Sequence, residues 1–270
     1  MKITEAIKIL AEAGIDDPRR EARLLFSKFT PLTEIEIYSP DAECDSEQLL
    51  SALERRAKRY PLQYIIGEVD FYRESYKITE SCLIPRSDTE ILVEEAIKRL
   101  PSGAHFIDLC TGSGCVGLSI LNNTSRTSAA LLDISEPALE TARENAARLS
   151  LTERAEFILG DAKSLIPKRR FFAVISNPPY VSADAYRKLE PEIYCEPKIA
   201  FLGGEDGLDF YRAIIPLYKE YVDENGFFAF EIGYDQADAV KRMAEENSLF
   251  SEIIKDYSSN DRVAILTFDK

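Results

Sequence analysis

The 270-residue chain is predicted to be an α/β protein with a doubly wound, mostly parallel sheet, a C-terminal antiparallel hairpin and a small N-terminal helical domain. Three observations predict this fold. From residue 105 onward, short apolar runs alternate with amphipathic helical segments, as in parallel sheets. The last two apolar runs are separated only by a short polar turn, which is typical of a hairpin. Before residue 61, apolar residues recur at helical spacing, with breaks at Pro18, Pro31 and Pro40.

Changes in the hydrophobic pattern divide the chain into three predicted segments. Residues 1–63 form the helical domain. Residues 64–85 form a β-hairpin linker, because "IIGEVDFYRESYKI" places aromatic and β-branched residues around polar ones. Residues 86–270 form the α/β domain, whose first helix, residues 90–100, is expected to be capped by Ser87 or Asp88.

Each element of the α/β domain has its own signal in the sequence. The expected strands cover residues 105–110, 128–134, 155–161, 171–177, 226–233, 251–258 and 262–268. The expected helices cover residues 114–121, 135–150, 207–222 and 235–247. The second of these helices has Ser135 as its N-cap and Pro137 in its first turn, both frequent at those positions.

Composition and charge exclude several classes of protein. No apolar run approaches the roughly 18 residues of a membrane span and no cleavage site follows the start, so a cytoplasmic protein is expected. The formal net charge of −14 argues against a surface that neutralises nucleic acid phosphates, and a monomer is the default expectation. Five cysteines without C-x-x-C spacing and a single histidine, His105, predict that no metal is bound.

A glycine-rich loop lies between the first expected strand of the α/β domain and its following helix. Gly112, Gly114 and Gly117 have the Gly-x-Gly-x-x-Gly spacing, and Asp133 ends the next strand. This pattern fits the dinucleotide-binding fingerprint, so an NAD-dependent dehydrogenase is one hypothesis. The physical requirement is more general, because glycines let a ligand lie against bare backbone and a carboxylate accepts hydrogen bonds from ribose hydroxyls. Any cofactor that contains adenosine suits this arrangement.

Two further acidic residues favour S-adenosylmethionine over NAD. Asp108 lies in the strand before the loop, where a carboxylate can pair with an ammonium group, which NAD lacks. Asp161 ends the third strand, where it can accept a hydrogen bond from an adenine amino group. Each of these two can equally be a turn or capping residue, but their order along successive strands favours a cofactor site. The set therefore resembles class I S-adenosylmethionine-dependent methyltransferases, with a Rossmann-like fold.

The fourth expected strand ends in Asn177-Pro178-Pro179-Tyr180. In a doubly wound sheet this end lies beside the glycine loop. Asn177 offers a carbonyl oxygen to one N–H of an amide or aromatic amine, and the main-chain carbonyl of Pro178 can accept the other. Pro179 has no N–H and its fixed φ stiffens the turn, while Tyr180 can pack against a flat amide or base. Both acceptors strengthen as positive charge develops on the nitrogen, so they favour the transition state.

Several stretches together are similar to one family. They are "YPLQYIIGEVDFY", "LIPRSDTEILVE", "DLCTGSGC", "SNPPYV", "EPKIAFLGGEDGLDFYRAI", "GFFAFEIGYDQ" and "DYSSNDRVAIL". In this order, across residues 60–268, they closely resemble the peptide chain release factor glutamine methyltransferases. The resemblance implies transfer of a methyl group from S-adenosylmethionine to the amide nitrogen (N5) of the glutamine in the Gly-Gly-Gln motif of class I release factors.

The resemblance also implies roles for individual residues. The cofactor would be held by Asp108, Cys110, Thr111, Gly112, Ser113, Gly114, Asp133 and Asn177, with Asp161 and Ala162 near its adenine. Asn177, Pro178, Pro179 and Tyr180 would bind the glutamine amide, and Arg86 with Glu196-Pro197 would form a wall of the site. The class I release factor is the implied partner, and the helical domain would help to dock it. The family usually has glycine at the position of Cys110 and an aromatic residue at the position of Ala162.

Two alternatives stay open on the sequence. A DNA or RNA amino-group methyltransferase fits Asn177 to Tyr180 equally well, but it predicts a basic groove that the sequence does not indicate. A non-catalytic cofactor-binding module is the second alternative, and it predicts that replacing Asn177 leaves the biological role intact.

Overall fold

The structure of the protein, a computed structural model, describes residues 1–268. It divides into two compact units: Met1–Glu68 with Glu190–Cys195, and Val69–Leu189 with residues 196–268. The sequence placed the first boundary at residue 63 and had no signal that Glu190–Cys195 belongs with the helical unit. Within the described residues no helix has the length and apolar character needed to cross a bilayer.

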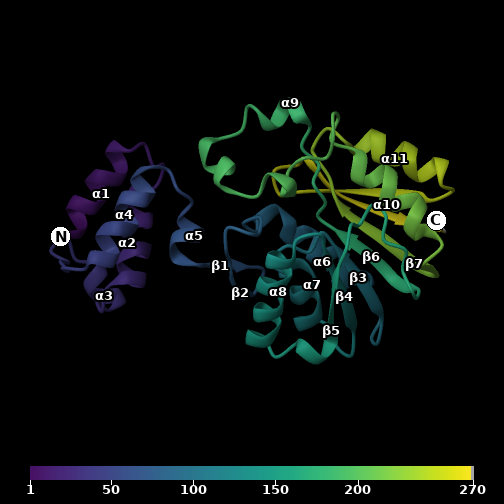
Figure 1. Cartoon of the computed structure of the whole chain (residues 1–270), viewed down its shortest axis with the longest axis horizontal. Helices are drawn as coiled ribbons and strands as arrows, with labels where there is room; N and C mark the ends of the chain where they lie inside the picture. Colours follow the sequence, from purple (N-terminus) through teal and green to yellow (C-terminus); the bar gives the residue numbers. More distant parts are fainter. Residues whose placement is uncertain (269–270) are drawn as a thin grey trace. The chain divides into compact units, whose positions relative to one another are not determined.

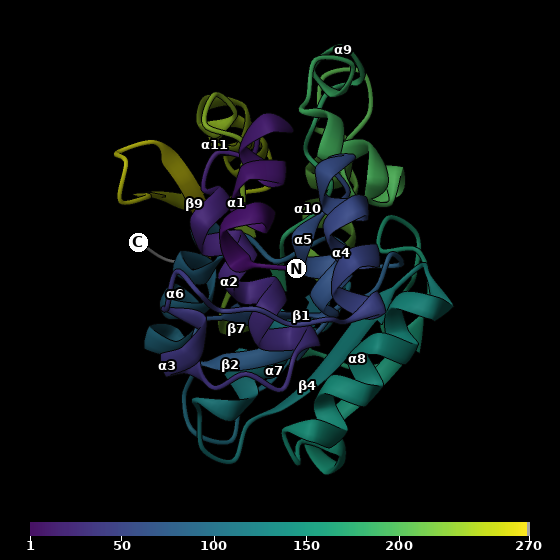
Figure 2. The same ribbon diagram turned by 90° about the vertical axis from the view of Figure 1, so that its left-hand side faces the viewer.

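The first unit is helical, as its apolar spacing predicts (Figure 1). Its helices are α1 (Ile3–Glu12), α2 (Pro18–Phe29), α3 (Glu34–Ile37), α4 (Glu47–Ala57) and α5 (Leu62–Ile66). Figure 2 shows α1, α2 and α4 grouped together, and they share a core that includes Leu10, Phe26 and Leu53. The Asp17 side chain caps α2 by accepting from the Arg20 N–H, and Ser46 caps α4 by accepting from the Leu49 N–H.

The expected β-hairpin is present but shorter than the sequence indicated. Residues 64–66, expected in the hairpin segment, belong to α5 instead. Gly67 ends this helix in the left-handed conformation at φ 79°, a common helix stop. The hairpin itself is β1 (Glu68–Phe71) paired with β2 (Glu74–Lys77).

The second unit contains a seven-stranded sheet in the order β5-β4-β3-β6-β7-β9-β8. Its strands are β3 (His105–Leu109), β4 (Ser128–Asp133), β5 (Ala155–Leu159), β6 (Phe171–Ser176), β7 (Val222–Glu231), β8 (Phe250–Lys255) and β9 (Asp261–Thr267). The first five strands in this order pair in parallel, and β9 pairs antiparallel with β7 and β8. The predicted fold class is therefore confirmed.

Helices cover both faces of this sheet (Figure 1). They are α6 (Glu90–Arg99), α7 (Cys115–Asn122), α8 (Glu136–Arg148), α10 (Asp209–Lys219) and α11 (Ala237–Glu246). A further short helix, α9 (Ala183–Tyr186), lies in the segment between β6 and α10 and contributes no buried residue. Because successive side chains of a strand point to opposite faces, Phe106 packs in the core under α6 and α7, whereas Ile107 packs in the core under α10 and α11.

Two local predictions have different outcomes. Ser135 caps α8 as expected, because its Oγ accepts from the Ala138 N–H at 3.3 Å. The prediction that Ser87 or Asp88 caps the first helix is wrong. These residues form a 3₁₀ turn, Ser87–Thr89, and α6 begins after Thr89 without a side-chain cap.

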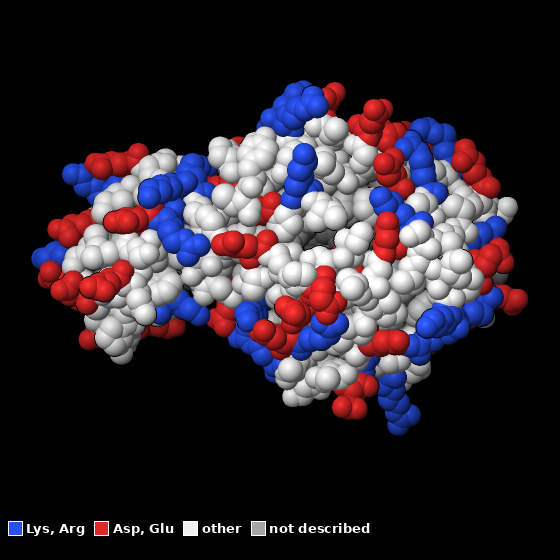
Figure 3. Space-filling view, viewed as in Figure 1, with Lys and Arg blue, Asp and Glu red and all other residues white. Residues whose placement is uncertain are grey.

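Charged side chains of both signs are interspersed on the face that Figure 3 shows, with no single extended basic surface. This agrees with the formal net charge of −14. On this face the distribution gives nucleic acid phosphates no continuous basic track.

Candidate active site

The loops that carry the predicted site residues meet at the carboxyl edge of the parallel strands. β3 lies between β4 and β6, and the register pairs Leu109 with both Leu132 and Ser176. Strand β3 is therefore the point at which the strand order reverses, where ligands bind in doubly wound folds. The register brings Cys110 of the glycine loop and Asn177 next to one another at this edge, as predicted.

A cavity lies at this edge of the second unit. Of the predicted site residues it is lined by Cys110, Gly112, Asp133, Asp161, Ala162, Asn177 and Pro179. The predicted residues that do not line it are Asp108, Thr111, Ser113, Gly114, Pro178 and Tyr180. The structure thus brings cofactor and amide-binding candidates to one cavity, and the others lie in the same strand, loop and turn without lining it.

Asp108 lies beneath the glycine loop and organises it. The side chain is 1% exposed, and its Oδ2 accepts hydrogen bonds from the Thr111 hydroxyl at 2.5 Å and the Gly117 N–H at 3.0 Å. A Cβ at Gly117 would lie 2.9 Å from the same oxygen, so only glycine lets the helix approach this closely. Burial raises the pKa of Asp108 to about 7, although both hydrogen bonds act in the opposite direction.

The loop itself contains three left-handed residues. Gly112 has φ 56° and Gly114 has φ 82°, which glycine adopts without steric cost. Cys110 has φ 59°, in the same region, at a cost of about 1–2 kcal/mol for a residue with a Cβ. The departure from glycine at Cys110 therefore leaves the left-handed turn in place and adds strain to it.

Asp133 connects the ends of β4 and β3. Its Oδ2 accepts from the Gly112 N–H at 2.8 Å and its Oδ1 accepts from the Ser135 N–H at 2.9 Å. Burial raises the pKa of Asp133 despite these bonds. Each carboxylate oxygen still has a free lone pair, so the side chain can accept two more hydrogen bonds from the cavity.

The far end of the cavity is formed after β5. Asp161 accepts from the Lys163 N–H at 2.9 Å through Oδ1, and Ala162 is buried. Two larger apolar residues also line the cavity, Phe210 and the half-exposed Ile134. Neither was predicted from the sequence. Ile134 directly follows Asp133 at a strand end, which is the one signal that could have identified it.

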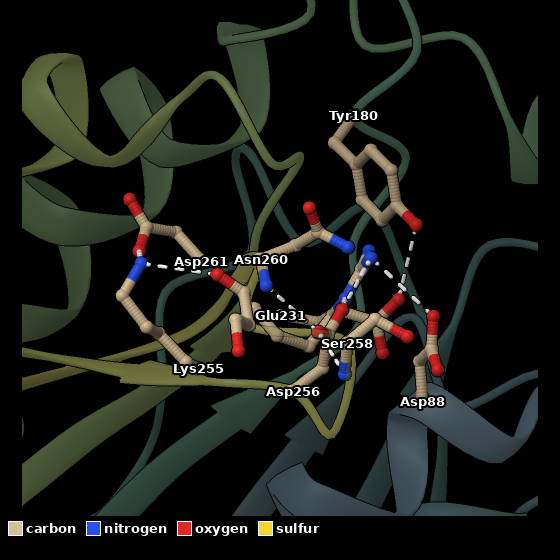
Figure 4. A network of polar contacts seen from close by, with 10 residues as sticks. Asp88, Tyr180, Glu231, Lys255, Asp256, Ser258, Asn260 and Asp261 are labelled. Carbon is tan, nitrogen blue, oxygen red and sulfur yellow. Dashed lines mark hydrogen bonds and ion pairs between the residues drawn. The ribbon is translucent and has the colours of Figure 1, made fainter.

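The turn after β6 is held from several sides. The Asn177 Nδ2 donates to the Thr89 hydroxyl at 3.2 Å. The Tyr180 hydroxyl donates to Glu231 Oε1 at 3.0 Å (Figure 4). The main-chain carbonyl of Tyr180 accepts from Gln236 Nε2 at 2.9 Å. Burial raises the pKa of Tyr180, and the neighbouring Glu231 adds to this shift. No hydrogen bond from residues 1–268 reaches the Pro178 carbonyl oxygen, which is therefore free to accept one.

Two glycines let the segment after α9 approach this turn. A Cβ at Gly203 would lie 2.6 Å from the Pro179 carbonyl oxygen, and a Cβ at Gly207 would lie 2.3 Å from that of Tyr180. Val181 completes the contact with two backbone hydrogen bonds, to the Phe201 carbonyl at 2.8 Å and from the Gly203 N–H at 3.0 Å. Gly203 and Gly207 of "FLGGEDGLDF" thus let this segment pack against the Asn177 turn.

The predicted wall residues Arg86 and Glu196 form an ion pair in which the carboxylate is buried and the arginine side chain is 40% exposed. Glu196 is 5% exposed, accepts from the Ile84 N–H at 2.8 Å through Oε2, and pairs with Arg86 through Oε1. Its neighbour Pro197 lines the cavity together with Ile199. The carboxylate therefore joins the segment before α6 to the segment that closes the cavity.

His105 lies at the opposite end of β3 from the cavity. Its Nδ1 is 2.8 Å from the Ser128 hydroxyl, and its ring stacks on Phe171 with centroids 5.1 Å apart. Burial lowers the pKa of His105. These contacts give His105 a structural role at the end of the strand away from the cavity.

Comparisons with known proteins give the family. Residues 3–67 match the PrmC N-terminal domain and residues 87–193 match the methyltransferase small domain. A release factor glutamine methyltransferase of Thermodesulfovibrio yellowstonii is 40% identical over 260 residues, which cover 93% of both chains. One of Caulobacter vibrioides is 37% identical over 270 residues, covering 97% of this chain and 93% of the relative.

Solved structures show the same fold at lower identity. The human Mettl16 catalytic domain in complex with an RNA hairpin has a TM-score of 0.58 at 13% identity, and the match covers 83% of each chain. A methyltransferase of Pyrococcus furiosus has a TM-score of 0.56 at 14% identity and covers 72% of this chain and 89% of its own. At these identities the likeness concerns the fold alone. Over nearly its full length, and with the methyltransferase fold around the cavity, this chain belongs to the release factor glutamine methyltransferase family.

Proposed function

We propose that this chain transfers the methyl group of S-adenosylmethionine to the side-chain amide nitrogen (N5) of the glutamine in the Gly-Gly-Gln motif of class I peptide chain release factors. One observation carries the proposal. Asn177 lines the same cavity as the glycine loop, next to a Pro178 carbonyl that has no hydrogen bond from residues 1–268, in a chain of this family. A glutamine amide has two N–H groups, and this turn offers two acceptors.

The residues of the cavity fit S-adenosylmethionine. A Cβ at Gly112 would meet nothing within 4 Å, so the glycine leaves open space at the cavity wall. Asp133 has two lone pairs left for ribose hydroxyls, and Asp161 lies at the far end for the adenine amino group. Asp108, Thr111, Ser113 and Gly114 shape the loop from behind. When bound, the cofactor supplies an electrophilic methyl group on its sulfonium.

The protein's own contribution to the reaction is to orient the amide nitrogen. An amide nitrogen is a poor nucleophile because its lone pair is delocalised into the carbonyl group. Asn177 Oδ1 and the Pro178 carbonyl fix the two N–H groups, and both acceptors stabilise the positive charge that develops on the nitrogen. The rigid Pro178-Pro179 pair keeps these two oxygens in place without reorganisation.

The same proposal extends to the partner and its docking. The helical unit of residues 1–68 helps to bind the release factor, and the enzyme acts as a cytoplasmic monomer on protein instead of nucleic acid. The formal net charge of −14 supports a protein substrate, because binding to nucleic acid phosphates needs clustered lysine and arginine side chains.

The experiment is methyl transfer from labelled S-adenosylmethionine to three substrates: a release factor, its Gly-Gly-Gln variant with alanine in place of the glutamine, and nucleic acid. We expect label on the intact release factor alone, mapped by mass spectrometry to the glutamine. Label on nucleic acid only would overturn the proposal in favour of an amino-group methyltransferase of DNA or RNA. Equal labelling of the alanine variant would place the methyl group on another residue.

A further inference from the structure

Gln236, the residue before α11, has a buried side chain with hydrogen bonds at both ends of its amide. Its Oε1 accepts from the Gly233 N–H at 2.9 Å. Its Nε2 donates to two main-chain carbonyls, those of Tyr180 at 2.9 Å and Gly207 at 3.2 Å. This one side chain therefore joins three segments: the loop after β7, the Asn177 turn and the loop before α10.

Only a carboxamide in one orientation can make these three contacts. If the Gln236 amide were reversed, its oxygen would face two carbonyl oxygens and its N–H groups would face the Gly233 N–H. A carboxylate has no N–H to donate, so a glutamate at this position would leave both carbonyls without a donor. The site therefore requires the two donors and the acceptor of a glutamine side chain.

The Asn177 turn has few hydrogen bonds of its own. Its two prolines have no N–H, and within the described part of the chain residues 178–180 make no backbone-to-backbone hydrogen bond. The bond from Gln236 to the Tyr180 carbonyl therefore fixes the main chain at this point. The Pro178 carbonyl, one of the two acceptors for the substrate amide, lies only two residues earlier.

Asn145 on α8 makes the same pattern of contacts at the glycine loop, and it is 1% exposed. Its Oδ1 accepts from the Lys77 N–H at 2.7 Å, and its Nδ2 donates to the carbonyls of Lys77 at 3.0 Å and Ser113 at 2.9 Å. The helix lies close to the loop, since a Cβ at Gly114 would be 3.1 Å from the Ala142 Cβ. The Asn145 amide thus ties the glycine loop to α8 and to the end of β2.

We propose that Gln236 is a positioning residue for the glutamine amide and that Asn145 is its counterpart for S-adenosylmethionine. The inference rests on the proposed function. Neither side chain lines the cavity, so each acts through the main chain that it holds. Gln236 acts through the Asn177 turn, and Asn145 acts through the Ser113 carbonyl of the glycine loop. Because the two amides hold different loops, their substitution should affect different steps.

The first test removes the hydrogen bonds of Gln236 and keeps the length of its side chain. We expect Gln236→Met to lower kcat for release-factor methylation about tenfold, because the acceptors of the Asn177 turn lose their fixed place. The Kd for S-adenosylmethionine, measured by titration calorimetry, should change by less than about twofold. An unchanged Kd also shows that the variant is folded, since the cavity lies in the same unit as Gln236.

Asn145→Leu is the matched variant, because it removes the same three contacts from the glycine loop. We expect it to raise the Kd for S-adenosylmethionine about tenfold, while kcat at saturating cofactor stays within about threefold of the wild type. If circular dichroism shows either variant to be unfolded, Gln236→Glu and Asn145→Asp repeat the comparison. Each of these keeps the bond from the backbone N–H and loses only the two donors.

The inference requires opposite effects of the two substitutions. An unchanged kcat for Gln236→Met would overturn it, as would equal changes of kcat and Kd in both variants. A lower kcat with an unchanged Kd for Asn145→Leu would also count against it. If the wild-type enzyme transfers no label to a release factor, the proposed function fails. The two Kd values then still test whether Asn145, and not Gln236, supports the cofactor loop.

Discussion

A substitution of Asn177 should reduce catalysis while leaving cofactor binding nearly unchanged. Asn177→Ala removes an acceptor that gains strength in the transition state, so kcat/KM for the release factor should fall about 10²-fold. The affinity for S-adenosylmethionine, measured by titration calorimetry, should change by less than threefold. Asn247→Ala at the C-cap of α11, outside the cavity, is the control. Parallel losses of cofactor affinity and rate would instead show that Asn177 serves mainly to hold the cofactor.

Asp108 gives the folded protein a defined pH dependence. Its carboxyl group keeps its proton up to about pH 7 when folded, whereas in the unfolded chain it loses the proton near pH 4. Between these two pH values the carboxyl group ionises in the unfolded chain only, so rising pH stabilises the unfolded state relative to the folded state. The free energy of unfolding of the wild type, relative to Asp108→Asn, should therefore fall as the pH rises from about 4 to about 7 and then stay constant.

The measurement is urea denaturation of both proteins without cofactor at pH 5.5, 6.5, 7.5 and 8.5. Taking the difference between the two proteins cancels the contributions of Asp133 and Glu231, whose pKa values are also raised by burial. A difference that stays the same from pH 5.5 to 7.5 would mean that Asp108 is ionised in the folded protein throughout this range.

At the scale of elements, the segment with Gly203 and Gly207 should be essential to the Asn177 turn. Gly207 has φ 81°, and a Cβ there would lie 2.3 Å from the Tyr180 carbonyl oxygen and 2.7 Å from Gln236 Nε2. Gly207→Ala should therefore lower the free energy of unfolding by about 2–4 kcal/mol and reduce kcat, because the turn must move.

Gly103→Ala is a matched control for this prediction. Gly103 has a similar φ of 85°, but a Cβ there would meet nothing within 4 Å. The free energy of unfolding of this variant should fall only by the strain of a left-handed residue with a Cβ, about 1–2 kcal/mol, and its kcat should not change. Equal effects of the two substitutions on kcat would show that the contact with Tyr180 does not matter to the reaction.

At the scale of the whole molecule, two units with separate cores predict two responses to ligand. The core with Leu10, Phe26 and Leu53 belongs to the helical unit, and those on the two faces of the sheet belong to the other. The cofactor candidates all lie in the second unit. In scanning calorimetry, S-adenosylmethionine at 100 times its Kd should stabilise that unit by about 2.7 kcal/mol and leave the transition of the first unit unchanged. Equal shifts of both transitions, or a single transition, would contradict this prediction.

Much of the architecture follows from local sequence. Alternating apolar runs and helical segments predict the sheet and its helices, and Ser135 caps α8 as its position before Pro137 indicates. One boundary was set by a partner distant in sequence, and another by a local helix stop. Strand β7 begins at Val222, four residues before the expected start, because Val222 pairs with Phe171 on β6. At residues 64–66 the local signal was misjudged: α5 continues to Ile66 and ends only at Gly67, whose left-handed conformation is a common helix stop.

The sequence by itself determined the chemical character of the site: a glycine loop after β3, carboxylates at successive strand ends, and the Asn177 turn after β6. These signals are local, since each depends on a residue type at a strand end. Only the tertiary structure decided which groups face the cavity. It placed Asp108 behind the loop, tied Tyr180 to Glu231, and brought Thr89, 88 residues away in the chain, to the Asn177 amide. Side-chain direction and hydrogen-bond partners depend on contacts between distant segments, and no local pattern encodes them.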